Sequence, residues 1–279
     1  MPGRFEGKSV FITGGSSGIG AALGVAFARE GARVALAARN LDRLADSARA
    51  VEAAGGEAIA LRCDVTDRAS IDSAVKRAVE KFGGLDVVVA NAGFGVDGVI
   101  MKLETKDYRR QFDTNVFGAI DTVYATLPHL IESRGRLAIV SSVLGKIGRP
   151  AMSAYAASKF AVCGFAESIY YELADLGISV TCVNPGLVES NFRVVDNEGR
   201  FHEEWTDPAP RFFVMPAERA ARHIVRAIYK RRFESNVTFH GKFGIFMNRH
   251  FPWMVRTAQR QLTKGRVHRF DRPTRDEKG

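Results

Sequence analysis

The chain has 279 residues, 46% of them hydrophobic, which is enough to bury a sizeable core as one large domain or two small ones. Its three cysteines, Cys63, Cys163 and Cys182, are far apart and lack metal spacing, so they indicate reduced core thiols rather than a disulfide scaffold. The net charge of +9 is uneven: residues 1–210 hold 23 Lys and Arg against 26 Asp and Glu, whereas residues 211–279 hold 17 against 5.

Apolar runs alternate with helical patterns along the chain. The sequence predicts strands at 9–13, 33–38, 57–61, 86–90, 136–141, 179–183 and 236–239, and helices near 18–30, 41–54, 67–82, 105–132, 152–175 and 217–231. Strands rich in Val, Ile and Ala without polar alternation are typical of a parallel sheet covered on both faces. The order therefore predicts an α/β protein with one doubly wound sheet of about seven strands.

The first predicted strand runs directly into the sequence TGGSSGIG at 13–20. A strand, a glycine-rich turn and a helix together bind anions, because the free N–H groups at the start of the helix face a pyrophosphate. Gly14 would allow the tight turn, Gly18 the close approach of a cofactor, and Gly20 close packing of helix on strand. The spacing differs from G-x-G-x-x-G, so taken alone the segment fits an ordinary chain turn equally well.

Tyr155 and Lys159 are four residues apart in a segment that favours helix, so they should lie on one helical face. In one interpretation Tyr155 is half-buried and Lys159 extends to water. In the other, the lysine charge stabilises a phenolate and makes Tyr155 an acid/base catalyst.

Six motifs occur in the order seen in the short-chain dehydrogenase/reductase family: TGGSSGIG, NAG at 91–93, Asn115, SS at 141–142, YAASK at 155–159 and NPG at 184–186. The chain resembles this family over about residues 6–240, and the resemblance implies an NAD(P)-dependent oxidoreductase with one Rossmann-type domain over residues 1–240. It also implies four catalytic residues: Asn115, Ser142, Tyr155 and Lys159. The cofactor-binding residues it implies are Gly14, Ser16, Ser17, Gly18, Ile19, Gly20, Arg39, Asp64, Val65, Asn91, Ala92, Gly93, Tyr155, Lys159, Pro185, Gly186, Val188 and Ser190.

Some of these residues also fit purely structural roles. Asn115 could hold a water that connects Lys159 to solvent, or it could be a helix amide bonded to backbone. Asp64 could flank the adenine or form a turn. Because neighbouring strand residues point to opposite faces, only one of Ser141 and Ser142 should face the cleft.

The end of the second strand bears on the choice of cofactor. Ala38 stands where NAD sites usually place an acid for the ribose 2′-OH, and Arg39 follows it. A neutral residue with an arginine removes repulsion and offers a fork for a 2′-phosphate, so the sequence predicts NADP(H).

Residues 187–215 lack clean periodicity, and a loop of this length is usually functional or disordered. By the resemblance this loop is the substrate lid. Its aromatic residues suit an apolar pocket wall or an ordinary core, as does Phe94: Phe192, Phe201, Trp205, Phe212 and Phe213. We assign no metal site, since His202 and His223 have no partner at ligand spacing.

Residues 241–279 are predicted to form a basic C-terminal extension. After Pro252, an amphipathic helix should carry Met254, Val255, Ala258 and Leu262 on one face. It could pack on its own domain or on a partner subunit, or it could contact an acidic membrane and open a route for a lipophilic substrate. Nucleic acid is not expected as a partner, because basic charge alone is unspecific.

Two functions are consistent with these patterns. The first is an NADPH-dependent oxidoreductase that interconverts a ketone and a secondary alcohol on a lipophilic substrate, steroid-like or a long-chain 3-keto lipid. The second is an NADPH-sensing binding protein that signals through its basic tail. The intact set of Ser142, Tyr155 and Lys159 favours the enzyme. The resemblance implies a homodimer or homotetramer through helices near 105–132 and 152–175. Without an apolar signal region or a membrane-length run, the expected location is cytoplasmic, or peripheral at the inner face of a membrane.

Overall fold

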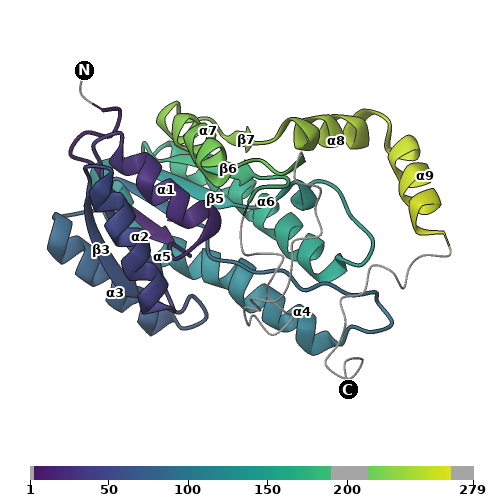
Figure 1. Ribbon diagram of the computed structural model, residues 1–279, viewed down its shortest axis with the longest axis horizontal. Helices are drawn as coiled ribbons and strands as arrows, with labels where there is room; N and C mark the ends of the chain where they lie inside the picture. Colours follow the sequence, from purple (N-terminus) through teal and green to yellow (C-terminus); the bar gives the residue numbers. More distant parts are fainter. Residues whose placement is uncertain (1–2, 190–212, 265–279) are drawn as a thin grey trace.

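The computed structural model describes residues 3–189 and 213–264, and a seven-stranded parallel sheet lies at its centre (Figure 1). The strand order is β3-β2-β1-β4-β5-β6-β7. The strands are β1 (Ser9–Thr13), β2 (Arg33–Ala38), β3 (Glu57–Arg62), β4 (Val87–Ala90), β5 (Arg136–Val140), β6 (Ser179–Asn184) and β7 (Glu234–Asn236). The order reverses between β1 and β4, which opens a crevice at their carboxyl ends where such sheets bind ligands.

Helices cover both faces of the sheet and explain why its strands are apolar on both sides. On one face lie α1 (Gly18–Ala28), α2 (Leu41–Ala53) and α7 (Ala217–Tyr229), and on the other lie α3 (Arg68–Phe82), α5 (Gly118–Ser133) and α6 (Ser153–Ala174) (Figure 1). In β1, Phe11 packs into one core while Val10 and Ile12 pack into the other. The predicted doubly wound sheet of about seven strands is therefore confirmed.

Two predicted elements differ from the structure. The last strand was expected at 236–239 but ends at Asn236, because the Thr238 hydroxyl accepts a bond from Gly241 N and caps a helix, α8 (Phe239–His250). The helix expected over 105–132 is interrupted. α4 (Thr105–Phe112) leads into a π-helical turn at Asp113–Phe117 before α5 begins. Such wide turns often occur at functional sites.

The described part of the C-terminal extension, up to residue 264, forms two helices, α8 and α9 (Pro252–Thr263), which stand at the end of the molecule far from α3 (Figure 1). α8 begins two residues before the predicted start of the extension at 241. Both helices contact the loop after β5, since Asn248 Nδ2 donates to Lys146 O at 3.1 Å and Gln259 Nε2 donates to Gly148 O at 3.0 Å. α9 was predicted as an amphipathic helix, but its apolar side is not buried: Met254 and Leu262 are exposed. Within the described ranges, no helix is long and apolar enough to cross a membrane.

The three cysteines are buried and carry free thiols, as the sequence predicted. Burial, with Asp64 and Asp67 nearby, raises the pKa of the Cys63 thiol to about 11. Cys163 on α6 and Cys182 on β6 lie 3.7 Å apart between their sulfur atoms. These thiols contribute to the core of the α5–α6 side of the sheet.

Candidate active site

Asn91, just after β4, holds the glycine-rich turn that follows β1. Its side-chain Nδ2 donates to Thr13 O at 2.9 Å and to Gly14 O at 3.2 Å. Gly14 has φ +67°, and a Cβ there would lie 2.8 Å from Ala92 Cα. A Cβ at Gly20 would lie 2.2 Å from Gly14 O. Only glycine fits at these two positions, and the absence of side chains there lets the first turn of α1 pack closely against the turn after β1.

The first turn of α1 has the features of an anion site. The first N–H groups of a helix have no partner within the helix. Ser17 precedes this helix in an extended conformation and makes no side-chain cap, and the first turn carries no acidic residue. These amides, together with the close-packed glycines, fit the pyrophosphate of a dinucleotide.

The neighbouring strand ends supply the edge where an adenosine would lie. Ala38 is buried at the end of β2, and the Arg39 side chain that follows is exposed. Asn40 caps α2 by accepting a bond from Arg43 N at 2.9 Å. Asp64 Oδ1 accepts from Thr66 N at 3.0 Å and from Thr66 Oγ1 at 2.8 Å, so this carboxylate forms the turn that was one of its two interpretations.

Tyr155 and Lys159 lie on α6 and are both buried, at 8% and 4% exposure. Lys159 Nζ donates to Val140 O at 2.8 Å and lies 5.8 Å from the centre of the Tyr155 ring. The interpretation in which Lys159 extends to water is therefore wrong. Burial lowers the pKa of Lys159 to about 8, so its charge becomes sensitive to pH near neutrality.

Ser141 and Ser142, which follow the end of β5, make different contacts. Ser141 Oγ donates to Lys159 O at 3.0 Å and faces α6. Ser142 Oγ instead accepts from Leu144 N at 3.1 Å. Because this hydroxyl uses a lone pair for Leu144, its own hydrogen stays available to a ligand.

Asn115, in the π-helical turn, connects the NAG segment to α6. Its Oδ1 accepts from Phe94 N at 3.1 Å, and its Nδ2 donates to Phe94 O at 3.0 Å and to Ser158 Oγ at 3.1 Å. A Cβ at Gly93 would lie 3.0 Å from Asn115 Oδ1 and 3.6 Å from Lys159 Nζ. The side chain does bond to backbone, as one interpretation held, but to a distant loop beside Lys159 rather than to its own helix.

His240, at the start of α8, is a residue that the sequence gave no reason to select. Its Nε2 accepts from Leu187 N at 3.1 Å, and a Cβ at Gly186 would lie 2.6 Å from the same nitrogen. Pro185 O, in the same segment, accepts from Val143 N at 2.9 Å. The bond between Leu187 and His240 joins residues 53 positions apart, so no local pattern could reveal it.

The predicted lid is only partly described. Its two ends pair where Val188 bridges Met215, and Phe213 is half exposed with its ring 6.4 Å from that of His240. Ser190, Phe192, Phe201, Trp205 and Phe212 lie outside the described residues.

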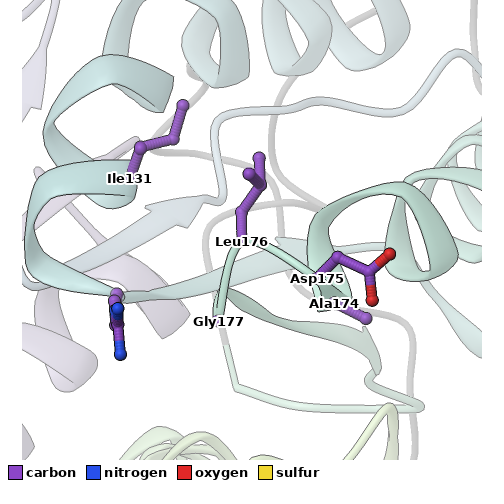
Figure 2. A pocket seen from close by; sticks show the side chains of 6 residues that line it. Ile131, Ala174, Asp175, Leu176 and Gly177 are labelled. Atoms are coloured by element: carbon purple, nitrogen blue, oxygen red, sulfur yellow. The ribbon is translucent and has the colours of Figure 1, made fainter.

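A pocket of about 410 Å³ lies at the opposite edge of the sheet, between the ends of α5 and α6 (Figure 2). It is lined by Ile131, Arg134, Ala174, Asp175, Leu176 and Gly177. Because these residues precede β5 and β6, the pocket is separate from the crevice. Among the described residues, no cluster of His, Cys, Asp or Glu could hold a metal ion.

A glycine cradle at the reversal of a parallel sheet, beside a buried tyrosine–lysine pair, defines a Rossmann-type oxidoreductase. Comparison with known proteins gives the family. Residues 8–200 match the family model described as short chain dehydrogenase, and the chain belongs to the short-chain dehydrogenase/reductase family.

Three relatives illustrate the match. A putative oxidoreductase SadH from Mycobacterium tuberculosis is 36% identical over 234 residues, which is 81% of this chain and 84% of that protein. A 3-oxoacyl-[acyl-carrier-protein] reductase FabG from Thermotoga maritima is 37% identical over 191 residues, 67% of this chain and 76% of the relative. A Burkholderia phymatum short chain dehydrogenase/reductase solved in complex with NAD superposes with a TM-score of 0.80 at 25% identity, covering 90% of this chain and 96% of that one. Another matching relative is far longer, and this chain covers 18% of it.

Proposed function

We propose that the protein interconverts a ketone and a secondary alcohol on a lipophilic substrate with NADP(H). The observation that carries the proposal is the buried pair of Tyr155 and Lys159, with the Ser142 hydroxyl at the adjacent strand end. When bound, the nicotinamide supplies or accepts the hydride. The chain's own residues handle the charge and the proton at the substrate oxygen.

In the reductive direction, the Ser142 hydroxyl donates a hydrogen bond to the carbonyl oxygen, and the Tyr155 hydroxyl donates the proton that this oxygen requires. The phenolate left behind is favoured by the Lys159 ammonium, since an adjacent positive charge lowers the pKa of a phenol. With a pKa of about 8 in the cofactor-free protein, Lys159 is largely charged at neutral pH. Its remaining N–H donors suit the ribose hydroxyls of the cofactor.

The catalytic test replaces the two residues separately. Tyr155→Phe should abolish turnover and leave NADPH binding nearly intact, because it removes only a proton donor. Lys159→Ala should damage both. The assay follows NADPH oxidation across steroid ketones, 3-oxoacyl thioesters and small ketones. Near-normal turnover by Tyr155→Phe would contradict the acid/base role, and NADPH binding without oxidation of any ketone would favour the sensing alternative.

Preference for NADP(H) over NAD(H) rests on the end of β2. A buried neutral Ala38 and an exposed Arg39 offer a 2′-phosphate a cation without a competing carboxylate at that position. Arg39→Asp should lower kcat/KM for NADPH strongly and raise it modestly for NADH. A wild-type enzyme that prefers NADH would contradict this proposal.

A lipophilic 3-keto substrate is supported by the similarity to the FabG reductase and by apolar side chains near the site. Phe94 follows the NAG segment, and Arg110 Cζ lies over its ring at 4.9 Å from the ring centre. Phe213, at the end of the predicted lid, is half exposed. We expect long-chain ketones to have a lower KM than short ones of the same chemistry.

We infer a homodimer or homotetramer through α5 and α6. Phe117 ends the π-helical turn, and Tyr124 and Ile131 follow it on α5 at intervals of seven residues; all three are exposed, as are Phe160 and Tyr171 on α6. Exposed large apolar side chains that recur along a helix often belong to a protein interface. Tyr124→Glu should lower the mass measured by light scattering, and an unchanged mass would exclude this face.

A further inference from the structure

The C-terminal helices α8 and α9 expose many large apolar side chains to solvent. The exposed fraction reaches 83% for Phe239, 65% for Trp253 and 67% for Leu262. The exposed apolar residues of α8, α9 and the joint between them are Phe239, Phe243, Phe246, Phe251, Trp253, Met254 and Leu262. Apolar side chains gathered in this way mark a contact surface.

The same two helices carry basic residues and no acidic ones. Residues 239–264 contain five basic and no acidic residues; the basic ones are Lys242, Arg249, Arg256, Arg260 and Lys264. The outer side of α7 adds three exposed arginines, Arg219, Arg222 and Arg226, against one exposed acidic residue, Glu218. Burial, and then the charges of Lys242 and these three arginines, lower the pKa of His223, so Lys242 of α8 lies near the basic residues of α7.

We propose that the outer sides of α7, α8 and α9, called here the docking surface, bind a membrane rich in acidic phospholipid. The basic side chains contact the headgroups, and the aromatic side chains enter the interface between headgroups and acyl chains. A second copy of the chain fits poorly, because a two-fold contact would place this cationic surface against itself. The sequence of α8 and α9 offers no acidic residue to compensate.

The attachment of α8 to the body explains what such docking would do. α8 and α9 bond to the loop at 146–148, a few residues beyond Ser142, and His240 holds the first end of the lid at Leu187. A membrane on the docking surface therefore lies near the entrance of the proposed substrate site. This consequence rests on the proposed function, whereas the docking itself does not.

The test is co-sedimentation of the full chain with vesicles of phosphatidylcholine alone or with about 30% phosphatidylserine, in low salt and in about 0.5 M NaCl. We expect binding to the acidic vesicles only, and at least a tenfold loss in high salt. Each basic residue close to the surface should strengthen binding about fivefold. Arg256→Gln with Arg260→Gln should therefore weaken binding more than tenfold. The matched control, Lys76→Gln with Arg77→Gln on the distant α3, should change little (Figure 1).

The apolar contribution has its own control. Trp253→Ser should weaken vesicle binding, and Trp253→Phe should largely restore it. Turnover of a small water-soluble ketone, or the melting temperature if no ketone is turned over, shows that each variant is folded. Absence of binding to acidic vesicles at low salt overturns the proposal. So does binding that ignores phosphatidylserine, or a change of oligomer mass in Trp253→Ser without vesicle binding, which would assign the surface to a second copy.

Discussion

Lys159 should destabilise the cofactor-free fold, so its replacement by methionine is expected to stabilise the protein while ending turnover. Burial lowers the pKa of this lysine from 10.5 to about 8, which corresponds to roughly 3 kcal/mol against the charged form. The variant also loses the bond from Nζ to Val140 O at 2.8 Å, and this loss offsets about 1–2 kcal/mol of the gain. At pH 7, Lys159→Met should therefore raise the free energy of unfolding by about 1–2 kcal/mol.

The pH dependence distinguishes this cause from better packing. Because the folded protein binds the Lys159 proton more weakly than the unfolded chain does, the cost is fully present below pH 8 and fades as the pH rises toward 10.5. The gain from Lys159→Met should shrink over that interval and then reverse. Urea unfolding at several pH values measures it, with Tyr155→Phe in both proteins so that the phenol does not titrate. A variant that is less stable at pH 7, or a difference that is constant with pH, would refute the reasoning.

Three further predictions concern the site. Gly20→Ala places a Cβ 2.2 Å from Gly14 O and should weaken NADPH binding at least tenfold, as seen by fluorescence titration; unchanged affinity would contradict the cradle. Asn115→Ala leaves Phe94 N without its acceptor, while Phe94 O keeps the bond from Gln111 and Ser158 keeps its bond to Tyr155 O; it should lower the free energy of unfolding by about 1–3 kcal/mol, measured with urea. Ser142→Ala should lower kcat about 100-fold while Ser141→Ala changes it little, since only the first hydroxyl is available to the substrate; equal effects would reject the assignment.

The central strands of the sheet were predictable because they satisfy one simple condition, which the polar edge strand β7 does not. A strand buried on both faces must be apolar along its whole length, so runs such as 9–13 and 33–38 identify themselves. The helices were predictable because the segments between these strands have helical patterns. Their order and the glycine turn fix where the sheet reverses, and with it the position of the crevice.

The errors arise where a local pattern yields to a side-chain contact. Periodicity predicts a continuous helix through Asn115, but its amide bonds across to Phe94 in the structure, and the turn around it is widened. The sequence NVTF at 236–239 is typical of a short strand, yet the Thr238 hydroxyl caps the next helix. Both outcomes depend on atoms that a one-dimensional pattern does not contain.

From the sequence, only the residue types of the candidate site and their order along the chain could be predicted. Spacing brought Tyr155 and Lys159 to one helical face, but it could not show that the lysine is buried and bonded to Val140. His240 had no signal at all, since its importance comes from a backbone N–H at the far end of a long loop. Burial and long-range contact are properties of the packed chain.

The bond from Leu187 N to His240 Nε2 has a thermodynamic consequence. It joins α8, on the proposed docking surface, to Leu187, the first residue of the predicted lid, and under both proposals it couples membrane binding to substrate binding. Coupling between two binding equilibria is reciprocal: if vesicles tighten the binding of a lipophilic ketone by some factor, the ketone must tighten vesicle binding by the same factor. Such an enzyme would reside longest on membranes that hold its substrate and leave them as the substrate is consumed.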